Sequence, residues 1–162
     1  MGIVLVSTEG ERFPITNQMA ELSATLEQMC FATIPSDGTG EEIAVSLSFK
    51  KKAVRKLVKW MELYLVNQQQ SSSVEQPQTN ILANWQRRFF QSLSHKRLIS
   101  LLNLANFLHV SALLETGSTF VSEKLVNKTV EEARAYLGQK SDFSATEERE
   151  NNEKFGWLMD KF

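Results

Sequence analysis

The sequence predicts a mixed α/β fold in which a small sheet packs with several helices. Short runs of β-branched and other apolar residues lie near the N-terminus, and from about residue 50 onward the apolar residues recur at helical spacing. A chain of 162 residues is long enough to bury a sizeable core. Its 42% hydrophobic and 23% charged residues are ordinary for a globular protein, so composition supports a folded domain.

The first 50 residues predict three strands and two short helices. Residues 3–6 form a β-branched run, and a second run around Phe13 follows a turn-forming segment, which predicts a hairpin. Between residues 16 and 31 apolar side chains recur every three or four positions, and Ser23 is placed to cap the second of two short helices. Residues 43–47 alternate apolar with polar or small side chains, as a half-buried strand does.

Residues 50–66 predict an amphipathic helix with a cationic face. Six cations and no acid lie between residues 50 and 59. Two interpretations follow: a patch for nucleic acid or an anionic membrane, or a solvated face beside acidic segments of the same protein. The second is favoured because no aromatic residues are interleaved with the cations, so neither nucleic acid nor a membrane is an expected partner. The predicted buried stripe is Val54, Leu57, Val58, Met61 and Leu65.

Residues 67–80 predict a flexible linker, because NQQQSSSVEQPQTN is polar and low in complexity. A short connector helix is expected next, with Trp85 and Phe89 on one face.

Residues 98–126 predict the central helical segment. One stripe, at the spacing that packs a helix onto a core, contains Leu98, Leu101, Leu102, Ala105 and Leu108. Leu104 and Phe107 lie on a second face beside Asn103 and Asn106. Either this helix is covered on all sides within its own domain, or its second face docks a partner.

The C-terminal residues predict capped helices without a core of their own. Ser111 is placed to cap a helix that contains Leu114 and Phe120. Capping boxes are expected at Thr129-x-x-Glu132, in a helix ended by Gly138, and at Ser144-x-x-Glu147. The few large apolar residues beyond are too sparse to bury one another, so the helices are expected to pack against an outside partner.

No residue pattern indicates catalysis. Two histidines and one cysteine provide no zinc ligand set, and no phosphate-binding loop or nucleophile motif is present. The sequence therefore predicts no enzyme, no catalytic residue, no cofactor and no metal. A single cysteine and the lack of a secretory signal or a membrane-length apolar run favour a nuclear or cytoplasmic protein.

Several strings resemble one known family. They are Trp85 followed by Phe89, the segment LLNLANFLHVSALL, the pattern NKTVEEARAYL followed by KSDFS, and Trp157. Together they resemble the S-phase-kinase-associated (Skp) adaptor family of SCF ubiquitin ligases. The resemblance implies an α/β BTB/POZ-like domain, with residues 1–66 as its N-terminal half, 67–80 as a loop and 81–126 as its C-terminal helices. Residues 127–162 would be a helical extension that binds F-box proteins.

The function implied by this resemblance is that of a non-catalytic adaptor. It would link a cullin scaffold to F-box substrate receptors in an SCF-type E3 ubiquitin ligase and so promote ubiquitin-dependent protein degradation. The family's cullin-binding pair corresponds to Asn106 and Phe107. Its F-box-binding residues correspond to Leu98, Ile99, Leu137, Gln139, Phe143 and Trp157.

Three positions depart from the family pattern: Gln139 replaces an apolar residue, Phe155 an asparagine and Val130 a proline. These departures keep a second interpretation open, in which the protein is a structural or assembly paralogue that acts outside SCF complexes. Self-association through the BTB-like half is a further open alternative.

Overall fold

The computed structural model describes residues 2–32, 42–70 and 82–159. The chain divides into two compact units, Met1–Lys124 and Leu125–Phe162, which are described separately below. Mixed α/β structure is confirmed, with a three-stranded sheet and helices in the described residues.

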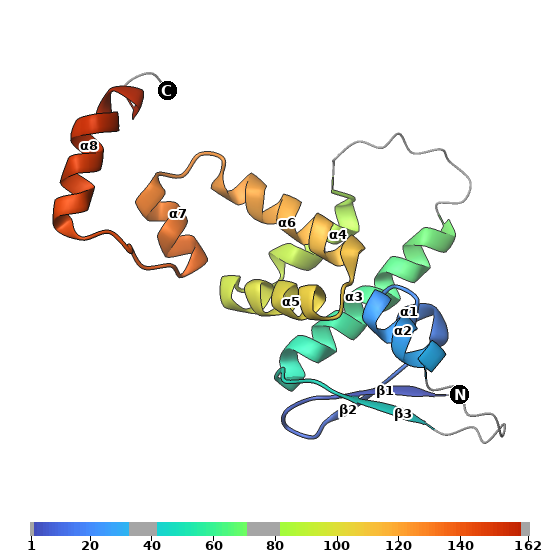
Figure 1. Ribbon diagram of the computed structural model, residues 1–162. Helices are drawn as coiled ribbons and strands as arrows, with labels where there is room; N and C mark the ends of the chain where they lie inside the picture. The colour runs from blue at the N-terminus through green and yellow to red at the C-terminus, as the bar shows by residue number, and fades with distance from the viewer. Residues whose placement is uncertain (1, 33–41, 71–81, 160–162) are drawn as a thin grey trace. The chain divides into compact units, whose positions relative to one another are not determined.

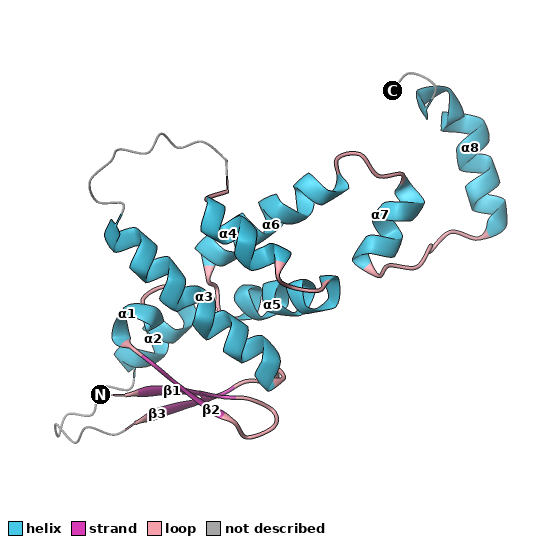
Figure 2. Ribbon diagram, turned by 180° about the vertical axis from the view of Figure 1, so that it is seen from behind, coloured by secondary structure: helices cyan, strands magenta, loops and turns pink. Residues whose placement is uncertain are grey.

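The sheet of the first unit has the strand order β2-β1-β3. Strand β1 (Ile3–Val6) pairs antiparallel with β2 (Arg12–Ile15) and parallel with β3 (Ile43–Ser46). Gly10 has a φ of 77° in the turn between β1 and β2, a value that glycine adopts without steric cost. The predicted hairpin and third strand are therefore confirmed, and Figure 2 shows the three strands of the sheet in magenta.

Two short helices follow the hairpin, α1 (Asn17–Ala20) and α2 (Ala24–Ala32). The Thr16 hydroxyl accepts a hydrogen bond from the Met19 amide, and the Ser23 hydroxyl accepts one from the Leu26 amide at 3.2 Å. Each hydroxyl satisfies an amide that the first helical turn leaves without a partner. The predicted division at Ser23 is confirmed.

The remaining helices of the first unit are α3 (Lys51–Gln70), α4 (Asn84–Gln91), α5 (His95–Phe107) and α6 (Ser111–Leu125), whose last residue enters the second unit. Helix α3 packs on both β2 and α5, and Figure 1 shows it between the sheet and helices α4 to α6. It continues to Gln70, four residues into the segment predicted as a linker, and residues 71–80 of that segment lie outside the described residues.

One hydrophobic core joins the sheet to these helices. The predicted stripe of α3 is largely confirmed, since Val54, Leu57 and Met61 are fully buried, and Trp60 joins them without having been predicted. The sequence left open whether the second face of α5 is covered within the domain or docks a partner, and the structure divides that face: Leu104 is 0% exposed, whereas Phe107 is 52% exposed. Helix α5 is covered on more than one side, by α3 and by α6, so its buried surface is wider than a single stripe.

Helices α5 and α6 approach closely at Gly117. A Cβ atom at this position would overlap the side chain of Leu102, so the glycine is required by packing. Ser111 was predicted as the cap of α6 but is its first helical residue. The Leu114 amide donates to the Val110 carbonyl at 3.0 Å, which makes Val110 the residue that precedes the helix.

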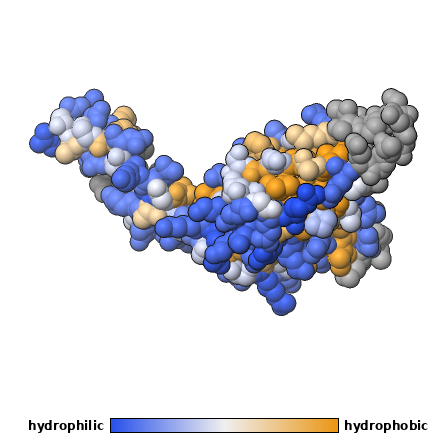
Figure 3. Space-filling view, turned by 90° about the horizontal axis from the view of Figure 1, so that it is seen from below, coloured by the Kyte–Doolittle hydropathy of each residue, from blue (hydrophilic) through white to orange (hydrophobic). Residues whose placement is uncertain are grey.

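The second unit contains α7 (Val130–Leu137) and α8 (Ala145–Met159). Both predicted capping boxes are confirmed: Thr129 and Glu132 bond reciprocally, as do Ser144 and Glu147. Gly138 ends α7 with a φ of 68°, also as predicted. No described side chain of α7 or α8 is buried, and Figure 3 shows hydrophobic residues there only as separate spots among hydrophilic ones.

Candidate docking surfaces

Asn106 and Phe107, predicted as a docking pair, lie in the last turn of α5 and are both exposed. Phe107 is 52% exposed, which is unusual for a phenylalanine in a folded domain. Its ring lies against that of Phe49, with the ring centroids 5.7 Å apart and the ring planes 55° apart. Phe49 comes from the segment before α3, so the aromatic surface is built by two elements distant in sequence. We call these two rings the Phe49–Phe107 pair.

The chain just after Phe107 is fixed to the first turn of α2. Ser23, which is 0% exposed, donates its hydroxyl hydrogen to the Leu108 carbonyl at 2.5 Å. The Thr25 hydroxyl lies 3.0 Å from Nδ1 of His109, and His109 has a φ of 52°, a value that is uncommon for residues other than glycine. These contacts determine how α5 ends and therefore where its last turn points.

The hairpin turn fixes the other side of the aromatic pair. The Thr8 amide donates to the Phe49 carbonyl at 3.0 Å, and the Glu9 carboxylate accepts from the Lys51 amide at 2.7 Å. Glu11 forms an ion pair with Arg55 at 2.5 Å and lies 3.7 Å from Lys51. The hydrogen bond from Arg55 holds the pKa of Glu11 below its ordinary value. The turn and the start of α3 are thus connected by several polar contacts.

These contacts also account for part of the cationic face of α3. Lys51 and Arg55 are paired with Glu11, and Lys59 with Glu62, as the interpretation of a solvated face beside acidic segments requires. Among the described residues, Lys50 and Lys52 have no ion-pair partner, and both are exposed.

The second set of predicted site residues is divided between the two units. Leu98 is 1% exposed and belongs to the core of the first unit, so its assignment as a surface anchor needs correction: the apolar stripe of α5 buries it. Ile99 beside it is half-buried. In the second unit, Leu137 is half-buried, and Gln139, Phe143 (49% exposed) and Trp157 (59% exposed) are exposed.

Arg134 organises the segment between α7 and α8, which sequence patterns did not predict. Its guanidinium donates to the Ser141 hydroxyl at 3.3 Å, lies 3.9 Å from the Glu148 carboxylate and sits 5.8 Å from the centre of the Phe143 ring. Ser141 in turn donates to Glu148 at 2.7 Å. These contacts hold Phe143 at the surface, where its exposed half is accessible to another molecule.

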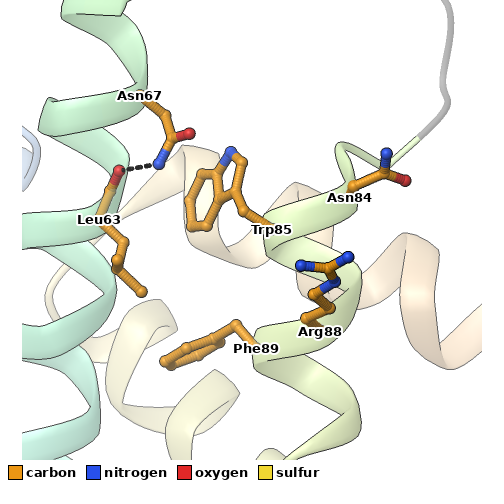
Figure 4. A pocket seen from close by; sticks show the side chains of 6 residues that line it. All are labelled: Leu63, Asn67, Asn84, Trp85, Arg88 and Phe89. Carbon is orange, nitrogen blue, oxygen red and sulfur yellow. Dashed lines mark hydrogen bonds between the residues drawn. The ribbon is translucent and has the colours of Figure 1, made fainter.

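A shallow, open pocket of about 620 Å³ lies between α3 and α4. Figure 4 shows Trp85 and Phe89 of α4 facing Leu63 of α3, with Asn67, Asn84 and Arg88 completing the wall. Asn67 donates its side-chain amide to the Leu63 carbonyl at 2.7 Å. The sequence placed Trp85 and Phe89 on one helix face, but the pocket also needs α3, whose position relative to α4 no local pattern specifies.

No metal-binding cluster of three or more His, Cys, Asp or Glu side chains occurs among the described residues. No described helix combines the length and apolarity needed to cross a membrane. The fold and its exposed surfaces define a small α/β protein whose aromatic side chains, Phe107, Phe143 and Trp157, are available for contact with other proteins.

Comparison with known proteins agrees with this class. Residues 111–158 match the family described as "Skp1 family, dimerisation domain". The chain is 24% identical over 159 residues to SKP1-like protein 13 of Arabidopsis thaliana, an alignment that covers 98% of this chain and 97% of that protein. It is 25% identical to Suppressor of kinetochore protein 1 of Schizosaccharomyces pombe, over 98% of both chains.

A third relative is the "E3 ubiquitin ligase complex SCF subunit sconC" of Arthroderma otae, which is 24% identical over 98% of this chain and 95% of its own length. The chain is therefore similar to Skp1-like proteins over nearly its whole length and matches the family model over residues 111–158, and the predicted resemblance is confirmed.

Proposed function

We propose that this protein is a non-catalytic adaptor that links a cullin scaffold to F-box receptors in an SCF-type E3 ubiquitin ligase, and so promotes ubiquitin-dependent protein degradation. The observation that carries the proposal is similarity to Skp1-like proteins along nearly the entire chain, including a relative named as an SCF subunit. The exposed aromatic residues of the structure support it, since an adaptor needs surfaces that other proteins cover. A nuclear and cytoplasmic location is part of the same proposal.

The cullin-binding surface in this proposal contains Asn106 and Phe107. The amide of Asn106 can both donate and accept hydrogen bonds, and the half-exposed Phe107 ring offers apolar area beside it. Fully burying an aromatic side chain of this size contributes on the order of 2 kcal/mol before ordering costs. A polar group beside an aromatic anchor is a common composition for the centre of a protein interface.

In this proposal the F-box contacts are Ile99 in the first unit and, separately, the second-unit residues Leu137, Gln139, Phe143 and Trp157. Leu98 is excluded from these contacts in the isolated chain by its burial. No described side chain of α7 or α8 is buried, so a receptor helix that covered their apolar residues would remove exposed area from water. Ordering these helices on binding lowers the net affinity and lets one adaptor fit different receptors.

The test is a pull-down with the double variant Asn106→Lys and Phe107→Lys. Both residues are exposed, so we expect the variant to fold, to keep its F-box partners and to lose cullin almost completely. Loss of both partners would indicate unfolding and calls for the single variants, each checked by circular dichroism. A wild-type protein that captures F-box proteins but never a cullin would contradict the proposal and favour an adaptor-like paralogue that acts outside SCF complexes.

A further inference from the structure

We infer that Phe49, Lys50 and Lys52 extend the docking surface of Asn106 and Phe107, and that this surface receives a segment of the cullin partner that combines apolar and acidic side chains. The inference rests on the proposed function and specifies the chemistry of the partner at that site. The sequence pattern presented Lys50 and Lys52 only as part of a cationic face, and it indicated no role for Phe49.

The rings of Phe49 and Phe107 contact each other. A centroid separation of 5.7 Å and an angle of 55° lie within the range of favourable aromatic pairs. Phe49 is half-buried and Phe107 is 52% exposed, so the pair presents a continuous apolar surface that the fold itself does not cover. A partner that covered Phe107 would therefore also meet Phe49.

Hydrogen bonds hold the backbone beside both rings of the Phe49–Phe107 pair. Phe49 is held through its carbonyl by Thr8, and the next turn of chain is held by the bond from the Lys51 amide to Glu9. On the other side, Ser23 holds the Leu108 carbonyl directly after Phe107. Because both rings are carried by fixed backbone, little conformational entropy remains to be lost when a partner binds.

Two exposed lysines, Lys50 and Lys52, follow Phe49 in the sequence. Glu11 is already engaged by Lys51 and Arg55, so it does not neutralise Lys50 or Lys52, the cations on either side of Lys51. Lys50 and Lys52 are exposed and form no ion pair with any residue that the structure describes. Their positive charge favours acidic residues on the partner and raises the rate of encounter with them.

The experiment measures binding of the full chain to a purified cullin by biolayer interferometry at two salt concentrations. The variant Phe49→Ala should raise Kd about tenfold, because it removes half of the aromatic surface. The double variant Lys50→Glu and Lys52→Glu should lower the association rate by about tenfold and weaken its dependence on salt.

A matched control is the double variant Lys96→Glu and Arg97→Glu, which makes the same change in charge on exposed residues of the first turn of α5. If the effect depends on where the positive charges lie, and not on the net charge of the protein, this control should change cullin binding by less than about twofold. Circular dichroism checks folding of every variant, and unchanged F-box binding checks the Phe49 and Lys50/Lys52 variants.

The outcomes separate this inference from the proposed function. If the wild-type chain binds cullin, and Phe49→Ala and the Lys50/Lys52 variant bind equally well, the inference is overturned and the proposed function stands. If the control weakens binding as much as the Lys50/Lys52 variant, the acidic contact is overturned. Binding of single-stranded DNA that competes with cullin and is lost in the Lys50/Lys52 variant would assign the surface to nucleic acid instead. A wild-type chain that binds no cullin overturns both.

Discussion

The hydroxyl group of Ser23 performs two tasks in the first unit. It accepts a hydrogen bond from the Leu26 amide at the start of α2 and donates one to the Leu108 carbonyl after α5. Its side chain is fully buried, so water cannot replace either bond. One small polar group thus links a helix start to the end of the helix that carries Asn106 and Phe107.

We expect Ser23→Ala to lower the free energy of unfolding by about 1–3 kcal/mol, since it leaves a buried carbonyl and a helix-start amide without partners. Chemical denaturation measures this change. Ser94→Ala is the matched control: Ser94 precedes α5 but its side chain makes no capping hydrogen bond, and its loss should cost less than about 0.5 kcal/mol. Equal effects of the two substitutions would contradict the role assigned to Ser23.

Leu104 and Phe107 illustrate the limit of prediction at single residues. Both were placed on the second face of α5 by helical spacing, yet Leu104 is fully buried and Phe107 is half-exposed. Spacing identifies which residues share a face, whereas burial depends on which other helix covers that face. The same limit explains Leu98, whose place in the apolar stripe correctly indicated core burial while the family resemblance indicated a surface contact.

At the scale of helices and strands, the features that depend on neighbouring residues were predictable. The hairpin, the division at Ser23, both capping boxes and the end of α7 at Gly138 all follow from residues within a few positions of one another. The Arg134 contacts, the pocket between α3 and α4 and the Phe49–Phe107 pair join residues that are farther apart. The local sequence pattern carries no information about contacts between distant residues, which explains why these three features were not predicted.

The cap of α8 predicts a pH dependence. The Ser144 amide donates to the Glu147 carboxylate at 2.8 Å, which lowers the pKa of Glu147 from its ordinary value of 4.5. Because the charged carboxylate is the form that accepts this bond, its contribution is fully present above pH 4.5. It is lost as the pH falls through the lowered pKa of the folded state.

We expect the Ser144 amide resonance to titrate below pH 4.5 in the wild-type chain, together with a loss of helix signal from the first turn of α8. Glu147→Gln should abolish that titration while keeping much of the cap, because glutamine also accepts the bond. Glu150→Gln, an exposed position within the same helix, should leave the titration unchanged. A Ser144 resonance that titrates identically in Glu147→Gln would show that another group is responsible.

At the scale of the whole molecule, the two units differ in what holds them together. The first unit has a core that includes Trp60, Phe90 and the leucines of α5, whereas the described helices of the second unit bury no side chain. The second unit is stabilised by helix caps, by the Arg134 contacts and by the ammonium of Lys128 over the Tyr136 ring. Each of these interactions is weak at an exposed site. Its helices should therefore open far more readily than α3 or α5.

Hydrogen–deuterium exchange of the full chain tests this difference. We expect amides of α7 and α8 to exchange at least about a hundredfold faster than those of α3 and α5, because none of the described side chains of α7 and α8 is buried. An F-box peptide at saturating concentration should slow exchange in α7 and α8 and leave α3 unchanged, since binding adds its free energy only to the elements that it orders. In Trp157→Ala, whose side chain is 59% exposed, the free chain should exchange like wild type while the peptide protects α8 less. Strong protection of α7 and α8 without any peptide would mean that the chain itself covers these helices, and their proposed role as a receptor-binding surface would then be contradicted.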